Sequence, residues 1–279
     1  MFDLGHQGGF QRSRGLAQAG FALKAGRTRL TTLAQSGSGK AMLPRVAGDV
    51  PEVVFLNTSG GLTGGDRLAF RLDVGPGARV SATTQTAERA YDAGGGEAAV
   101  EVTARLGAGA RLDWLPQETI LYERSRLHRR TTVDLTGDAA VLMAETLVLG
   151  RHAMGEEPRD ARLRDDRMVR RDGRPVWAEC LRLDAAALAR QHSPALLGGA
   201  RALAVVALVM RGAEDALAPL RALLTEPGCT AEASGWNGRL LARIVARDGW
   251  PLKRQLARVL ALLSGRPLPR VWQMQGDFA

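Results

Sequence analysis

Apolar and polar residues alternate along most of the first two thirds of the chain. The alternation is strict in residues 68–74 (Leu-Ala-Phe-Arg-Leu-Asp-Val) and 100–106 (Val-Glu-Val-Thr-Ala-Arg-Leu). Because successive side chains of a strand point to opposite faces, this pattern predicts strands with one buried face. Further strand-like segments lie at residues 53–56, 80–84, 111–115, 119–122, 131–135, 141–149 and 176–183.

Glycine-rich turns separate these strands at short intervals, at residues 75–77, 92–96 and 107–109. Short strands with regularly spaced turns predict an all-β sandwich, barrel or layered architecture. No long helix alternates with the strands, so we do not expect a parallel α/β fold.

The beginning of the chain has weaker signals. Residues 1–20 carry glycine, glutamine and serine without a period, and they predict a flexible N-terminal tail. Residues 21–23 and 27–33 predict two short strands, and the Ser/Gly-rich residues 35–40 predict a flexible loop. We therefore expect a tail at 1–20 and a single β-rich domain over residues 21–279.

The last third of the chain changes to helical spacing in two places. Leucines at positions 217, 220 and 224 predict one helix. A second helix, which begins at Pro251 and ends at Gly265, is predicted by the apolar stripe Leu252, Leu256, Val259, Leu260 and Leu263. Residues 201–211 and 240–245 predict strands, and the tail at 266–279 is interpreted as a docking arm or a frayed end. The expected fold is mainly β, a layered or superhelical β-strand body with two α-helices in the C-terminal third.

Residues 57–66 form the most unusual stretch, Asn-Thr-Ser-Gly-Gly-Leu-Thr-Gly-Gly-Asp, between two strand-like segments. Glycine reaches positive φ without steric cost, so we expect a doubly bent backbone with Gly64 at positive φ. Two interpretations of Asp66 stay open: it caps its own turn in a hairpin, or it is positioned for a ligand or partner. A phosphate loop is excluded, because no Lys-Ser/Thr pair and no helix follow the glycines.

The composition is that of a globular chain with 45% hydrophobic residues and a formal net charge of +9. Aromatic residues do not interleave with the basic ones, so an acidic protein partner is favoured over nucleic acid. Cys180 and Cys229 form neither a disulfide framework nor a metal-type pair. The start of the chain does not resemble a signal peptide, and no apolar run is long enough to span a membrane. We expect a cytoplasmic protein without membrane association.

Residues typical of catalysis are sparse. None of the four histidines pairs with another at a metal-ligand spacing, so a zinc site is not expected. No Gly-x-Ser-x-Gly nucleophile elbow is present. Without clustered imidazole or thiolate ligands, the isolated chain is predicted to bind first-row metal ions weakly and with little selectivity.

Two carboxylates stand out because they lie in apolar stretches, Glu118 and Glu145. A carboxylate in a β core costs free energy unless it is hydrogen-bonded, paired or used. One interpretation is an internal salt bridge to Arg89, Arg124 or Arg151. The other is weak binding of a divalent cation by oxygen ligands along a path rather than in one closed site.

Four stretches share their order with the motifs of one family. They are residues 57–66; Thr83-Thr84-Gln85 followed by Arg89 and Tyr91; Leu115-Pro116-Gln117-Glu118-Thr119-Ile120; and Glu145 with Leu149-Gly150-Arg151 and then Gly155-Glu156. As an ordered set they resemble the UreD family of urease accessory proteins, also called UreH. The resemblance covers roughly residue 27 to the C-terminal helix. The family usually has lysine where Arg89 stands, which keeps the charge.

The resemblance implies a β-rich scaffold with two helices and no catalytic activity of its own. It implies a complex with UreF, with the GTPase UreG and with apo-urease, in which Ni²⁺ passes along an internal water-filled route. No cofactor is expected to bind tightly, and Ni²⁺ is expected to bind only transiently. On this basis Asp66, Glu118 and Glu145 become candidates for the nickel path. Candidate interface or structural-motif residues are Gly60, Gly61, Gly64, Gly65, Gln85, Arg89, Gln117, Arg151 and Glu156.

Two alternative functions remain beside a urease maturation scaffold. One is a β-sandwich hydrolase that uses acidic residues, and the other is an Arg-rich nucleic-acid-binding protein. Loss of DNA and RNA binding at moderate salt, with binding to apo-urease retained, would exclude the nucleic-acid binder.

Overall fold

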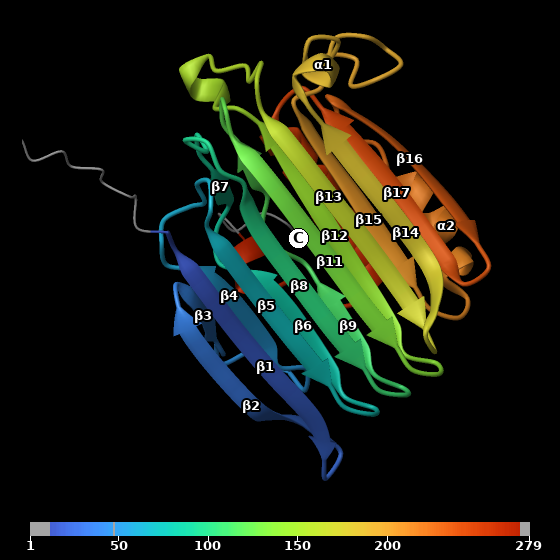
Figure 1. Cartoon of the computed structure of the whole chain (residues 1–279). Coiled ribbons are helices and arrows are strands. Elements are labelled where there is room, and N and C mark those ends of the chain that lie inside the picture. Colours follow the sequence, from blue (N-terminus) through green and yellow to red (C-terminus); the bar gives the residue numbers. More distant parts are fainter. Residues whose placement is uncertain (1–11, 47, 274–279) are drawn as a thin grey trace, which may run out of the picture.

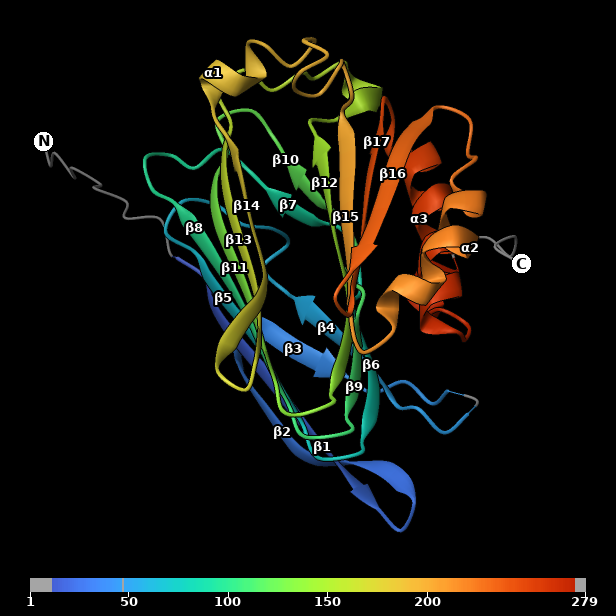
Figure 2. The same cartoon turned by 90° about the vertical axis from the view of Figure 1, so that its right-hand side faces the viewer.

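The computed structural model describes residues 12–46 and 48–273, which form two facing β-sheets and a layer of helices (Figures 1 and 2). The first strands are β1 (Arg14–Lys24), β2 (Arg27–Gly37), β3 (Gly39–Met42), β4 (Glu52–Asn57), β5 (Arg67–Val74), β6 (Arg79–Thr84), β7 (Glu88–Ala90) and β8 (Ala98–Leu106). The remaining strands are β9 (Arg111–Trp114), β10 (Thr119–Leu121), β11 (Arg126–Leu135), β12 (Ala140–Leu149), β13 (Arg162–Arg171), β14 (Arg174–Leu183), β15 (Ala202–Val209), β16 (Cys229–Trp236) and β17 (Arg239–Ala246).

The chain winds between the two sheets and adds one strand to each in turn. Sheet A has the order β14-β13-β11-β8-β5-β1-β2, and sheet B has the order β16-β17-β15-β12-β9-β6-β4-β3. In sheet B, β10 also pairs with β12, and β7 pairs with β10. The central ladders are parallel, from β5 to β8 to β11 to β13 in sheet A and from β4 to β6 to β9 to β12 in sheet B. The result is a β-solenoid of about four turns, which confirms the predicted superhelical β body. Parallel pairing is reached here by crossing between sheets rather than through crossover helices.

Whether buried and exposed residues alternate along a strand depends on how many faces of the strand are covered. In β5 and β8 buried and exposed residues alternate, because the outer face of sheet A lies in solvent. In β15 every residue is buried, and in β12 all but one, because sheet B is covered by sheet A on one side and by helices on the other. A strand buried on both faces has an almost continuous apolar sequence.

Two helices cover the outer face of sheet B, α2 (Leu217–Leu223) and α3 (Gly249–Ser264), as Figure 2 shows. A third, the single turn α1 (Ala185–Leu188), follows β14. Asp248 caps α3 by accepting a hydrogen bond from Trp250 N at 2.8 Å, and Gly265 ends the helix at φ 67°. The predicted stripe from Leu252 to Leu263 is buried against sheet B, which confirms this helix.

Several local predictions were wrong near the start of the chain. Residues 14–20, predicted as part of a flexible tail, belong to β1, which is 11 residues long because it pairs with both β2 and β5. Residues 35–40, predicted as a flexible loop, lie mostly in β2 and β3. The remainder of the predicted tail up to residue 11 lies outside the described residues.

The glycine stretch is not a hairpin. It joins β4 of sheet B to β5 of sheet A, and these strands do not pair with each other. Gly60, Gly61 and Gly65 have positive φ, but Gly64 does not. Gly64 is instead required by packing, since a Cβ there would lie 2.1 Å from the carbonyl oxygen of Ala93.

At the other end of the chain, the segment after α3 folds back on the body. Trp272 is buried, and its indole N–H donates to the carbonyl oxygen of Leu115 at 2.9 Å. Residues 266–273 are therefore neither an arm nor a frayed end, and the last six residues lie outside the described part of the chain. Among the described helices, none combines the length and apolar character that crossing a membrane requires.

Candidate functional site

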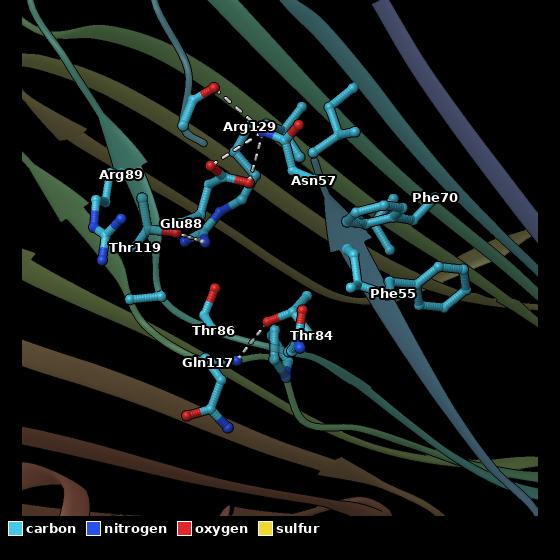
Figure 3. A pocket seen from close by; sticks show the side chains of 18 of the residues that line it. Phe55, Asn57, Phe70, Thr84, Thr86, Glu88, Arg89, Gln117, Thr119 and Arg129 are labelled. Atoms are coloured by element: carbon cyan, nitrogen blue, oxygen red, sulfur yellow. Dashed lines mark hydrogen bonds between the residues drawn. The ribbon is translucent and has the colours of Figure 1, made fainter. Parts of the chain in front are cut away.

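A cavity of about 110 Å³ lies between the two sheets, beneath residues 84–89 (Figure 3). Its apolar wall includes Phe55, Phe70 and Trp114. Side chains from both sheets add polar groups to the lining, namely Asn57, Glu88, Gln117, Thr119, Arg129 and Glu145. A cavity of this size with several polar partners has room for several water molecules.

Glu145 from β12 and Arg129 from β11 join the two sheets across this cavity. Arg129 Nη1 lies 2.7 Å from Glu145 Oε2, and the same guanidinium contacts Asp165 on β13 at 2.6 Å. The other oxygen of Glu145 accepts from the indole N–H of Trp114 at 3.2 Å and from the Thr131 hydroxyl at 3.4 Å. A salt bridge therefore holds Glu145, as one interpretation of the sequence predicted, but its partner is none of the three arginines expected.

The two acids beside Arg129 differ in how readily they ionise. Burial raises the pKa of Glu145, and the attraction of Arg129 only partly offsets it. Asp165 is also buried, but Arg129 and Arg167 both contact it and hold its pKa below the usual value. Asp165 therefore keeps the negative charge that balances the arginines, and Glu145 is the acid that more readily accepts a proton.

Glu88, at the start of β7, is a second acid in the cavity. The amide nitrogen of Asn57 lies 3.2 Å from its Oε2 and 3.3 Å from its Oε1. Burial raises the pKa of Glu88 to about 7, and the hydrogen bond from Asn57 opposes this only in part. Near neutral pH this carboxyl group exists in both protonation states.

The cavity opens to the surface beside the loop between β6 and β7. Gln85 and Arg89 line it and are exposed, whereas Gly60 and Gly61 from the glycine stretch form the facing wall. A Cβ at Gly61 would lie 2.4 Å from the Tyr91 ring, so glycine is needed there for close approach. Four of the predicted interface or motif residues thus surround one opening.

Asp66 lies outside the cavity lining and is buried in its own turn. Its Oδ2 accepts from Thr63 N at 2.9 Å, and its Oδ1 accepts from Ser13 N at 2.7 Å. Asp66 therefore caps its own turn, although this turn does not belong to the hairpin that the capping interpretation assumed. A place for Asp66 on a nickel path stays a prediction. The second bond, to a residue 53 positions earlier, fastens the chain before β1 to the glycine stretch.

Glu118 lies on the other side of sheet B, in a groove beside α3. Its side chain lies 3.5 Å from Lys253 Nζ, and Lys253 also donates to Gln117 Oε1 at 2.8 Å. Gln117 borders the cavity, and its amide nitrogen is buried without a hydrogen-bond partner among the described residues. The pair Gln117–Glu118 therefore connects the cavity lining with the groove under α3.

Arg151 and Glu156 form a separate surface site after β12. Arg151 Nε lies 2.7 Å from Glu156 Oε2, and its guanidinium lies 4.7 Å from the centre of the Tyr122 ring. Partial burial would raise the pKa of Glu156, but hydrogen bonds from Arg151 and from Glu123 N lower it overall. The two residues fix the loop conformation around Gly155.

The sequence interpretation missed Glu88, Arg129 and Asp165. Arg129 and Asp165 lie in two charge-rich runs of the sequence, residues 124–130 and 159–174. The available signal was the position of each residue in the alternation of its strand. Arg129 lies on the same face as Leu127 and Val133, and Asp165 lies on the same face as Leu163. A charge in phase with buried apolar residues faces the core.

No group of three or more His, Cys, Asp or Glu side chains able to hold a metal ion occurs among residues 12–46 and 48–273. The cavity acids are therefore separate oxygen ligands rather than a closed cage. Carboxylates and water hold first-row metals more weakly than imidazole and thiolate groups do.

Comparison with known proteins gives one consistent result. The sequence model of the UreD urease accessory protein family matches residues 13–273. Urease accessory protein UreD of Cereibacter sphaeroides is 61% identical over 263 residues, which covers 94% of this chain and 96% of that protein. The UreD proteins of Paracoccus denitrificans and a Methylobacterium species are 52% and 46% identical, each over at least 94% of this chain.

Proposed function

Because this chain belongs to the UreD urease accessory protein family, we propose that it binds UreF, UreG and apo-urease and conducts Ni²⁺ through its intersheet cavity. The family is non-catalytic and serves nickel insertion into urease. Because the chain belongs to this family, we no longer propose the two alternative functions, an acidic hydrolase and a nucleic-acid-binding protein.

The observation that carries the proposed nickel route is the acid-lined cavity, which opens to the surface and has room for several water molecules. Glu88 is the acid best suited to touch a passing ion, because its carboxyl group accepts from two neutral groups, the Asn57 amide and the Arg89 backbone N–H. With a pKa of about 7, it can release a proton when a cation arrives and recover it when the cation leaves. Weak oxygen ligands suit transport, since a tightly held ion would not move on.

The other predicted path residues take different parts in this proposal. Glu145 lines the same cavity, and its ion pair with Arg129 joins sheet B to sheet A. Glu118 supplies an acid beyond Gln117, where the route would continue toward the α3 groove. Asp66 acts by holding the turn that forms one wall of the opening.

The surface around the opening is proposed as the contact with UreF or apo-urease. Gln85 and Arg89 are exposed there, and Arg151 is exposed on the loop after β12. An ion leaving a cavity for a partner protein must do so at an interface that excludes bulk water. Residues that surround the opening are therefore the expected contacts.

Substitution of Glu88 by glutamine tests the route, because glutamine keeps the size of the side chain but not the charge. We expect normal soluble yield, normal recovery of complexes with UreF and apo-urease, and reduced nickel content and activity of the matured urease. Glu101→Gln is the matched control, since Glu101 is an exposed acid on the outer face of β8. Full nickel content with Glu88→Gln would remove this residue from the route, and absence of any complex with the unmodified chain would contradict the proposed function.

A further inference from the structure

The first three strands carry an unusual distribution of charge. Between residues 14 and 42 there are five basic residues and no acidic ones, namely Arg14, Lys24, Arg27, Arg29 and Lys40. This short segment holds more than half of the formal net charge of +9. Lys24, Arg27 and Arg29 gather at the β1–β2 turn, which Figure 2 shows at the end of a hairpin that reaches beyond the rest of the body.

Strand β2 forms one edge of sheet A and is unusually unprotected. It pairs only with β1 among the described strands, and ten of its eleven residues are exposed (Figure 1). Residues 30–37, Leu-Thr-Thr-Leu-Ala-Gln-Ser-Gly, contain no charge and no proline. Soluble proteins usually protect such edges with charges, proline or a covering segment, because free backbone groups accept a strand from another chain.

The register identifies which backbone groups of β2 are free. Ser38 N donates to Arg14 O, so the hydrogen-bonded pairs in this antiparallel ladder continue at Leu16–Ser36 and Gln18–Ala34. Leu33 and Gln35 occupy the alternate positions, and their N–H and C=O groups point away from β1. An added strand would find donors and acceptors at these two residues.

An apolar strip runs beside this free edge. Leu23, Leu30 and Leu33 are 47%, 40% and 42% exposed. Leu30 and Leu33 pair with the buried residues Phe21 and Ala19, so they lie on the face of sheet A that is turned toward sheet B. Sheet B ends there with the short strand β3, which leaves these side chains uncovered. Contiguous exposed apolar residues next to a free edge are typical of a binding site.

We propose that β2 is a docking edge for an extended segment of a partner protein, which adds to sheet A as an eighth strand. The segment would carry apolar residues at alternate positions, to cover Leu30 and Leu33, and acidic residues at the end that meets Lys24, Arg27 and Arg29. This mode is β-augmentation, in which backbone hydrogen bonds supply affinity and alternate side chains supply specificity. The proposal rests on the proposed function, because it places the partner within the urease maturation complex.

Hydrogen exchange tests the added strand directly. The probe is the complex purified from cells that express this chain together with urease subunits, UreF and UreG, compared with the chain alone. We expect exchange in the peptide covering residues 30–37 to slow by about tenfold or more in the complex, since the free amides of Leu33 and Gln35 become bonded. Unchanged exchange there in an intact complex overturns the docking edge and leaves the proposed function standing. Failure of the complex to form overturns the proposed function instead.

Two variants separate what the backbone of β2 and the charges at the β1–β2 turn each contribute to partner binding. Leu33→Pro removes an outward N–H without breaking the β1 ladder, and Arg29→Glu reverses one charge at the turn. Both should leave the melting temperature of the isolated chain nearly unchanged and lower recovery of the complex. Arg174→Glu is the control, because Arg174 is exposed at the hairpin on the opposite edge of sheet A. Equal recovery with Arg29→Glu and Arg174→Glu contradicts the acidic partner, and protection of residues 30–37 in a dimer of the isolated chain assigns the edge to a second copy.

Discussion

At the scale of single residues, Glu88 and Asp66 are acids with opposite surroundings. Both oxygens of Asp66 accept hydrogen bonds from backbone N–H groups, which fix this side chain in its turn. The Glu88 carboxyl accepts from the Asn57 amide and the Arg89 backbone N–H, and it lines the intersheet cavity. The first acid is suited to holding a turn, and the second to gaining and losing a proton or cation.

The raised pKa of Glu88 predicts a pH dependence of stability. Between about pH 4.5 and 7 the unfolded chain releases this proton while the folded chain retains it. The free energy of unfolding therefore falls as pH rises through this window, by up to about 3 kcal/mol from this group. In Glu88→Gln this part of the decline should be absent, as measured by denaturant unfolding at several pH values. A Glu88→Gln profile parallel to that of the unmodified chain would contradict the raised pKa of Glu88.

The paired hydrogen bonds of Asp66 predict that asparagine cannot replace it without cost. Asparagine offers one acceptor oxygen, and its NH₂ group would face a backbone N–H of Ser13 or Thr63. We expect Asp66→Asn to lower the free energy of unfolding by about 1–3 kcal/mol. Thermal unfolding with Asp73→Asn as control, at an acid with a single side-chain hydrogen bond from Gln18, measures the difference. Equal stability of the two variants would show that the second bond is dispensable.

At the scale of elements, α3 is the part most dependent on burial of one face. Its leucines pack against sheet B, whereas Leu262 on the same helix is 37% exposed. The helix is also fastened at its C-terminal end, where Arg111 donates to the carbonyl oxygens of Leu263 and Ser264. These contacts place the Gln117–Glu118 groove beside the helix.

This arrangement predicts different effects for two leucines of α3. Leu256→Asp would bury an unpaired carboxylate at a side chain that is 1% exposed, and should destabilise the protein by at least about 3 kcal/mol. We expect insoluble protein or loss of UreF binding. Leu262→Asp introduces the same charge at the exposed position and should stay within about 0.5 kcal/mol. Soluble yield and thermal unfolding distinguish the two, and a stable Leu256→Asp variant would show that the stripe is not buried.

At the scale of the whole molecule, a chain of ion pairs joins the two sheets from the cavity to the surface. It runs from Glu145 through Arg129, Asp165, Arg167 and Glu179 to Arg243. Glu145 and Arg243 belong to sheet B, and the residues between them belong to sheet A. These ion pairs link the two sheets beside the cavity that Glu145 and Arg129 line.

Removing Arg129 from the middle of this network should therefore lower the free energy of unfolding more than removing Arg243 from its end. Arg129→Met leaves Glu145 without its ion-pair partner and Asp165 with only Arg167, and we expect a loss of about 3–5 kcal/mol. Arg243→Met removes a partly exposed pair and should cost no more than about 1 kcal/mol. Denaturant midpoints at constant pH compare the two variants. Similar losses would indicate that the network does not hold the sheets together.

The sequence by itself determined the elements with a clear period and the family. Alternation predicted the strands of sheet A, such as β5 and β8, because each has one face in solvent. The stripe of α3 was equally readable, since the helix covers one sheet and leaves its other side exposed. The ordered motifs led to the UreD family because they are local stretches that need no knowledge of contacts.

Only the tertiary structure decided which residues form the site. Arg129 and Asp165 lie 36 positions apart, yet parallel pairing of β11 with β13 sets them directly opposite each other. Asp66 accepts a hydrogen bond from Ser13, which lies 53 positions earlier in the sequence. This bond fixes the chain just before β1, whose first residues carry no strand pattern of their own. The local pattern records whether a side chain faces the core, but its partner depends on the register between strands. That register is fixed by the winding of the whole chain between two sheets, and it brings Glu88 and Glu145 into one cavity.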